Sequence, residues 1–151
     1  LTITFDNYIV DGTAVGGAKV VTNNDPNKAT KNYIFTNFVI NATLVNATRG
    51  LKITWNSMKK FEWTEGIDTP TRSDDVLSIT GFASGTNSKK NAFTIVITKP
   101  LVRQLLCRFI VSGTVQTTES TNRFTRYGDG TCDNLAIIAI NGVSKPITLL
   151  K

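Results

Sequence analysis

The sequence predicts one all-β domain that is mainly antiparallel and contains about ten strands. Many short segments alternate apolar and polar residues with a period of two, and Gly, Asn and Asp recur between them about every ten residues. The chain is also rich in threonine, whose β-branched side chain fits the pleated surface of a sheet. A length of 151 residues suits a single domain, which we place at 1–151.

Alternation locates the strands in order along the chain. In 2–10 it places Ile3, Phe5 and Ile9 on one face. In 92–98 it directs Phe93, Ile95 and Ile97 inward. The same period puts five apolar residues of the segment 33–45 on one face: Ile34, Phe38, Ile40, Ala42 and Leu44. The run 134–140 is apolar on both faces, which predicts a central strand.

Turn residues separate these segments. The predicted turns are 11–13, 23–27, 84–86, 112–114, 128–131 and 141–142, and the longest irregular stretch is 64–75. No convincing amphipathic helix is present; 99–106 would form one helical turn or lead directly into a strand at 105–111. Periodicity alone does not arrange the strands, so we prefer a sandwich or roll and keep a closed barrel as the alternative.

The charge of the chain argues against nucleic acid as a partner. The net charge is +6 and the isoelectric point is about 9.5, but the basic residues are spread along the chain. We find no basic helix and no aromatic-interleaved RNA-binding motif, so a solvated basic surface is the simpler interpretation. No apolar run approaches the roughly 18 residues that would span a bilayer. A targeting segment or a lipid anchor would lie upstream of Leu1.

The two cysteines either form one disulfide or remain buried thiols. Two cysteines without any histidine are too few for a zinc site. Cys107 lies in the predicted strand 105–111, and Cys132 lies just before the apolar run, so neighbouring strands would bring them together. We predict the bridge, which implies an oxidising compartment.

The loop 127–134 combines acidic residues and glycines. Asp129, Asp133 and Asn134 offer oxygen ligands, but calcium requires six to eight oxygens, and only three such side chains cluster here. The alternative is a tight turn in which Gly128 and Gly130 supply positive φ angles. We favour this turn and predict no metal ion and no cofactor.

The absence of histidine excludes the common nucleophilic triads and the histidine-bearing zinc sites. A carboxylate pair for glycoside hydrolysis remains an alternative, drawn mainly from the 62–75 region. The candidate carboxylates are Glu62, Glu65, Asp68, Asp74, Asp75 and Glu119. Such residues are normally solvated surface charges, so we predict no catalytic residues.

Three aromatic residues are the best candidates for ligand binding. Trp55, Phe61 and Trp63 share parity, so one continuous strand would place them on the same face. If exposed, they would stack on sugar rings or anchor a partner protein; if buried, they belong to the core. The core is the simpler interpretation, because Leu51 and Ile53 continue the same face.

Several stretches resemble an uncharacterised group of exported, often lipoprotein-like proteins of Bacteroidetes bacteria. The resemblance covers roughly 2–150, and its motifs are "ITWNSMKKFEWTEG", "DDVLSITGFASGTN", "VSGTV", "YGDGTCDNLAIIAING" and "ITLL". It implies an all-β domain at or beyond the inner membrane, and it independently favours the Cys107–Cys132 bridge. It assigns no activity to any residue.

We therefore expect an exported protein of the periplasm, the outer-membrane surface or the extracellular space. Its expected role is non-enzymatic, as a structural or surface-binding domain of the cell envelope. A glycan or another envelope protein would be its partner. The alternatives are a carbohydrate-binding module and a glycan hydrolase.

Overall fold

The computed structural model describes residues 1–24 and 35–150, and in this part of the chain every regular element is a β-strand. No helix there is long and apolar enough to cross a membrane. The strands are β1 (Thr2–Val10), β2 (Thr13–Asn24), β3 (Phe35–Asn46), β4 (Leu51–Glu65), β5 (Val76–Thr86), β6 (Ala92–Gln104), β7 (Ser112–Thr118), β8 (Asn122–Asp129), β9 (Leu135–Ile140) and β10 (Val143–Thr148). The predicted all-β class is therefore confirmed.

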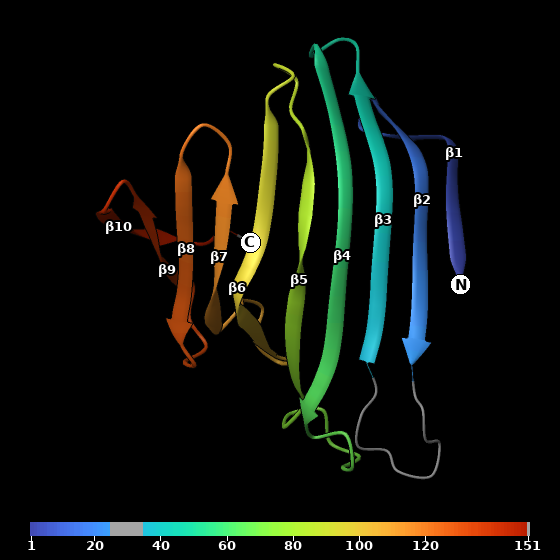
Figure 1. The fold of residues 1–151 in the computed structure, drawn as a ribbon. Helices are drawn as coiled ribbons and strands as arrows, with labels where there is room; N and C mark the ends of the chain where they lie inside the picture. The colour runs from blue at the N-terminus through green and yellow to red at the C-terminus, as the bar shows by residue number, and fades with distance from the viewer. Residues whose placement is uncertain (25–34, 151) are drawn as a thin grey trace.

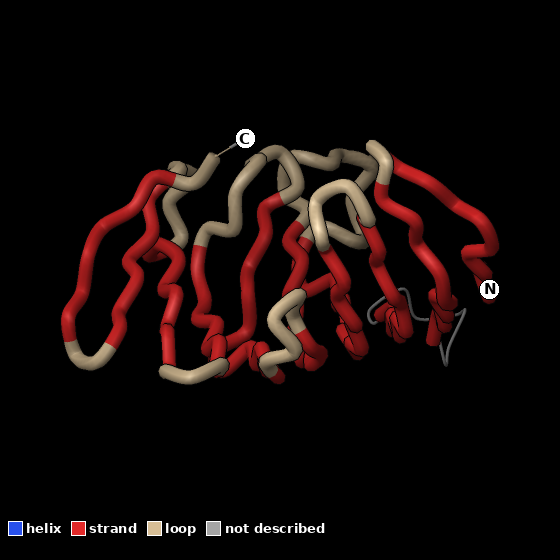
Figure 2. Tube along the Cα trace, turned by 90° about the horizontal axis from the view of Figure 1, so that it is seen from above, coloured by secondary structure: helices blue, strands red, loops and turns tan. Residues whose placement is uncertain are grey.

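All ten strands belong to one sheet in the order of the chain, from β1 to β10 (Figure 1). Every neighbouring pair is antiparallel, so the sheet is a continuous meander. Seen from above, the strands follow one another in a single curved layer (Figure 2).

The arrangement differs from the two packed sheets of a sandwich. The described strands form a single open sheet, with β1 and β10 at its opposite ends in both views (Figures 1 and 2). A sandwich needs connections that carry the chain from one sheet to the other, whereas here each strand returns beside the one before it. Among the predicted arrangements, the curved single layer is nearest to a roll.

Short turns keep successive strands adjacent. Asp11 and Gly12 have φ angles of 46° and 72°, and Asn141 and Gly142 have φ angles of 49° and 81°. Two consecutive positive φ values are the signature of a two-residue hairpin whose twist matches that of its strands. Both turns were predicted, whereas the turns predicted at 84–86 and 112–114 are wrong, because these residues pair within β5 and β7. Most of the turn predicted at 23–27 lies outside the described residues.

The pairing register assigns each side chain to one of two faces. We call the face that carries Trp55 and Ser57 of β4 the inner face, and the face that carries Met58 the outer face. On the inner face Ile40, Ser57, Ala83 and Ile95 are successive cross-strand partners. Ser57 and Ala83 are both buried. This row is the centre of the apolar packing.

The first strand departs from strict alternation. Ile3 and Phe5 share the inner face, as predicted, but Ile9 pairs with Ala14 and lies on the outer face. The register shifts between Phe5 and Tyr8, and one extra residue reverses the facing of every later side chain. The prediction for Ile9 is therefore wrong.

Two further strand predictions are wrong. Residues 105–111 form a loop, because β6 continues to Gln104 and the chain then turns, with the Cys107 amide donating to the Gln104 carbonyl. The apolar strand β9 is not central but lies next to the edge strand β10. Its apolar outer face is uncovered: Ile137 and Leu135 are exposed.

Candidate functional site

The loop between β8 and β9 is a turn fastened by a disulfide. Cys132 is bonded to Cys107 with a Cα–Cα distance of 5.7 Å, which confirms the predicted bridge. The Gly130 amide donates to the Val111 carbonyl at 2.9 Å, and the Gln104 side chain donates to the Gly130 carbonyl at 3.2 Å. The first contact attaches this loop to the segment 105–111, and the second attaches it to the end of β6. The disulfide indicates a non-reducing compartment.

The two acidic side chains of this loop cap backbone groups. Asp129 Oδ1 accepts a hydrogen bond from the Thr131 amide at 3.1 Å, and Asp133 Oδ1 accepts one from the Leu135 amide at 2.9 Å. The bond from Thr131 lowers the pKa of the Asp129 carboxyl. Within 1–24 and 35–150, no group of three or more His, Cys, Asp or Glu side chains is placed to hold a metal ion.

The predicted roles of the two glycines are half right. Gly130 has a φ angle of 110°, as the tight turn requires. Gly128 has no positive φ, and the prediction for it is wrong. It is needed for a different reason, because a Cβ atom there would lie 2.6 Å from the Val111 carbonyl oxygen. The close approach of two backbone segments at the disulfide cannot be read from the sequence.

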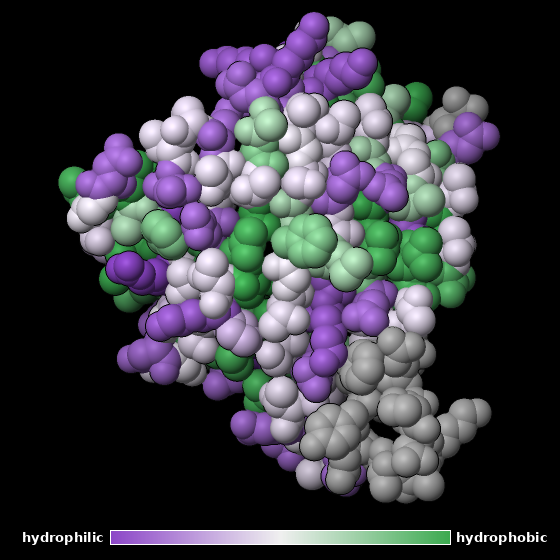
Figure 3. All heavy atoms as spheres, viewed as in Figure 1, coloured by the Kyte–Doolittle hydropathy of each residue, from purple (hydrophilic) through white to green (hydrophobic). Residues whose placement is uncertain are grey.

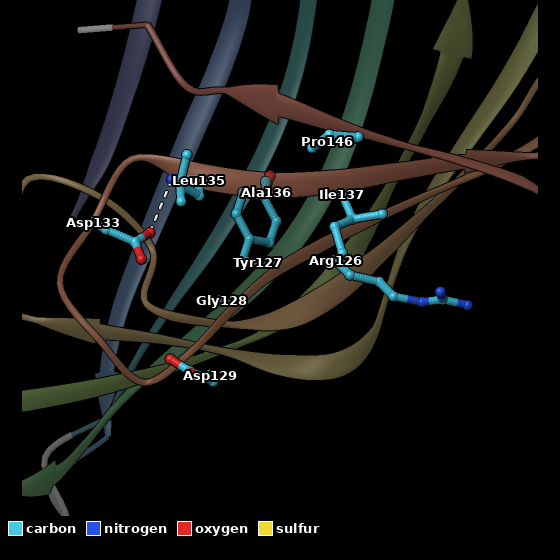
Figure 4. Close-up of a pocket in the computed structure, with 9 residues that line it drawn as sticks. All are labelled: Arg126, Tyr127, Gly128, Asp129, Asp133, Leu135, Ala136, Ile137 and Pro146. Atoms are coloured by element: carbon cyan, nitrogen blue, oxygen red, sulfur yellow. Dashed lines mark hydrogen bonds between the residues drawn. The ribbon is translucent and has the colours of Figure 1, made fainter.

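A shallow hollow of about 500 Å³ lies beside the fastened turn (Figure 4). Its lining residues are Arg126, Tyr127, Gly128, Asp129, Asp133, Leu135, Ala136, Ile137 and Pro146. Ile137 and Pro146 are cross-strand partners and form part of an apolar floor, while the Arg126 side chain extends away from the two aspartates. The hollow offers apolar contact and hydrogen-bond acceptors. None of its lining residues pairs a nucleophile with a base.

Tyr127 is a half-buried titratable group of this hollow. Burial raises the pKa of its phenol above 10.0, and the nearby Arg123 cation opposes the shift more weakly. The folded protein therefore resists ionisation of Tyr127, so its stability is retained below pH 10 and falls as the pH rises through the raised pKa.

We expect an absorbance titration to show one tyrosine ionising later than the others. The Tyr127→Phe variant should lack that late component and lose less stability above pH 10. A late component that survives in the variant would contradict the assignment.

The three aromatic candidates lie on one face of β4, as predicted. Trp55, Phe61 and Trp63 are all half-buried on the inner face. Trp55 packs against Phe93 with ring centroids 5.7 Å apart, and Phe61 meets Phe38 edge-on at 4.9 Å. Such pairs contribute to packing within the sheet.

The acidic region 62–75 forms a second hollow, of about 430 Å³, at the loop between β4 and β5. Glu62, Glu65, Asp68 and Asp74 line it together with Trp63. Two of these carboxylates have partners: Glu62 forms an ion pair with Lys60 at 3.0 Å, and Asp74 accepts hydrogen bonds from Thr69.

The remaining predicted carboxylates stand apart from this lining. Asp75 follows Asp74 in the same loop and lines an adjoining depression. Glu119 lies at the turn between β7 and β8, where it accepts hydrogen bonds from the Asn87 and Asn91 side chains at 2.6 and 3.2 Å.

The outer face carries a feature that the sequence analysis missed. Val20, Val39, Met58, Phe82 and Val96 are successive cross-strand partners from β2 to β6. We call these five residues the outer row. Four of them are exposed large apolar side chains, and Met58 and Phe82 at the centre are each 49% exposed. Figure 3 shows a hydrophobic band that crosses the strands near the middle of their length, with hydrophilic groups above and below it.

The outer row escaped prediction because its members are far apart in the chain. Four of them lie between polar residues of the same face, such as Val96 between Thr94 and Thr98, and Val20 follows only the small Ala18 on its face. Only the pairing register brings them into one line. A search for isolated apolar residues at polar-face positions would have found each of them, but not their alignment.

Comparisons with known proteins add no assignment. The sequence matches no family model and no curated protein, and no solved structure matches the chain.

Proposed function

We propose that this chain is an exported, non-enzymatic domain of the cell envelope that acts by presenting the outer face of its sheet to another macromolecule. The observation that carries the proposal is the outer row. Monomeric proteins rarely leave contiguous large apolar side chains exposed unless the patch takes part in binding. Here such side chains align across five neighbouring strands.

The large accessible surface area of the chain supports the proposal that a partner covers part of it. Its accessible area is 10095 Å², whereas a monomer of its mass is expected to expose about 7,600 Å². Stable domains usually stack two layers of secondary structure around a core. A sheet with one layer leaves a face that a partner would cover.

The disulfide supports the envelope location. Such a bond persists in oxidising surroundings, of which the periplasm and the cell exterior are the bacterial examples. Its position at the fastened turn also stiffens the end of the sheet that holds the apolar hollow.

The carbohydrate-binding alternative receives less support from the structure. A flat sugar-binding platform would present Trp55 or Trp63 to solvent, but both are half-buried on the inner face. The hydrolase alternative keeps one specific observation, which is the hollow lined by four carboxylates.

Activity measurements decide between the proposal and the hydrolase alternative. We expect the purified protein to release no products from a panel of polysaccharides and peptides. If a polysaccharide is cleaved and the Glu65→Gln or Asp68→Asn variant abolishes that cleavage, the non-enzymatic proposal fails. Lys52→Gln, on the outer face away from this hollow, is the matched control.

A further inference from the structure

We propose that the outer face binds a second copy of this chain, sheet against sheet, with the outer row at the centre of a two-fold interface. This inference rests on the proposed function, because it names the partner that covers the outer face. Two such sheets, stacked about 10 Å apart, would make the second layer that each chain lacks.

The area of the outer face fits a stable dimer. The whole chain, counting both faces of the sheet and the loops, exposes about 2,500 Å² more than a monomer of its mass should, and permanent homodimers bury about 1,000–2,500 Å² on each chain. The five strands of the outer row, spaced about 4.8 Å apart and taken over about ten residues each, have a footprint of roughly 800 Å². That footprint alone reaches the size of a standard specific interface.

The charge distribution favours a second copy over other partners. The chain carries a net charge of +6, so two copies repel each other over most of their surfaces. The row of residues beside the outer row carries no charge at all. Its members, again successive cross-strand partners, are Ala18, Asn41, Asn56, Ser84 and Thr94.

The opposite flank of the outer row is nearly neutral as well. Thr22, Asn37, Lys60 and Thr80 are partners there, and the Lys60 cation is held 3.0 Å from the Glu62 carboxylate. An apolar centre with an uncharged polar rim is the usual composition of a protein interface. An acidic macromolecule or an anionic membrane would instead be met by cations around the apolar residues.

Two-fold symmetry would place Met58 close to Met58 of the second copy. Met58 is the middle member of the outer row, so an axis through the centre of the interface brings it near its own symmetry mate. If the axis runs parallel to the strands, the two ends of the row lie opposite each other. A charge placed at position 58 would face the same charge in the other copy.

Charge substitutions at Met58 test this interface. We expect light scattering of the wild type to give twice the 16.5 kDa of one chain. Met58→Glu and Met58→Lys should each weaken self-association at least about 100-fold, because each buries like charges together. An equimolar mixture of the two variants should recover the dimer, since opposite charges then face each other.

The control is Val143→Lys, which charges an exposed apolar residue on the edge strand β10, outside the outer row. It should leave the dimer intact, and circular dichroism should show the native sheet in every variant.

If a Met58 variant loses its fold, Phe82→Thr takes its place and should also yield monomers. A wild type that is monomeric at every concentration, or a dimer that survives in both Met58 variants, overturns the inference. Neither result would revive an enzymatic role, which the product-release measurement tests separately.

Discussion

Replacing both Cys107 and Cys132 with alanine is expected to lower the free energy of unfolding by about 3.5 kcal/mol. The bridge closes a loop with a sequence separation of 25, and its loss restores the conformational entropy of that loop in the unfolded chain. The cost is large beside the 5–15 kcal/mol that is typical of whole domains. Chemical denaturation followed by circular dichroism measures the change.

The wild type under reducing conditions provides the control for the cysteine variant. Reduction opens the same bond without altering either side chain's volume, so reduced wild type and variant should unfold at similar denaturant concentrations. Cys107 is buried, so the variant should be slightly the weaker of the two. If reduction leaves the unfolding midpoint unchanged, the bridge does not supply this stability.

The substitution Gly17→Ala is expected to destabilise the protein by about 3 kcal/mol or more. Gly17 lies within β2 at a φ angle of 121°, which L side chains rarely adopt. An added Cβ would collide with the Asn41 carbonyl oxygen and lie 2.9 Å from the Ala42 Cα. Both obstacles are backbone of the neighbouring strand β3, so relief requires the two strands to separate.

The preceding residue provides a matched control for Gly17. Gly16 has no heavy atom within 4 Å of an added Cβ, and its φ angle is not positive. Gly16→Ala should therefore be neutral or stabilise by about 0.5 kcal/mol, because alanine restricts the unfolded chain. Equal effects of the two substitutions in thermal unfolding would show that the close approach to β3 does not govern stability here.

The local features of the molecule were predictable from neighbouring residues. The Asp11–Gly12 and Asn141–Gly142 turns follow from residue types that accept positive φ angles. The shared face of Trp55, Phe61 and Trp63 follows from the period of two along one strand. The irregular stretch predicted at 64–75 contains the observed loop, which is two residues shorter because β4 continues to Glu65.

Features that depend on a partner strand were not predictable. Ile9 lies on the outer face because of a register shift against β2, and residues 105–111 form a loop because the disulfide and Val111 draw them against the β8–β9 turn. Nothing in the sequence distinguishes the roles of Gly17 and Gly128. In the structure Gly17 leaves room for the backbone of β3, whereas Gly128 leaves room for the Val111 carbonyl.

The candidate sites show the same difference between features that were predictable from the sequence and features that depend on strand pairing. The bond between Cys107 and Cys132 could be predicted, because two cysteines in a chain without histidine are too few for a zinc site. The outer row gave no such signal, since its five members belong to five strands and only the pairing register aligns them.

By itself, the sequence determined the all-β class and the Asp11–Gly12 and Asn141–Gly142 turns, and it favoured the bond between the two cysteines, because each depends on local residue preferences or on the only two thiols of the chain. The tertiary structure alone decided that the strands form one open layer and that Met58 and Phe82 meet on its outer face. Those outcomes depend on register between strands, where a shift of one residue moves a side chain to the opposite face of the sheet.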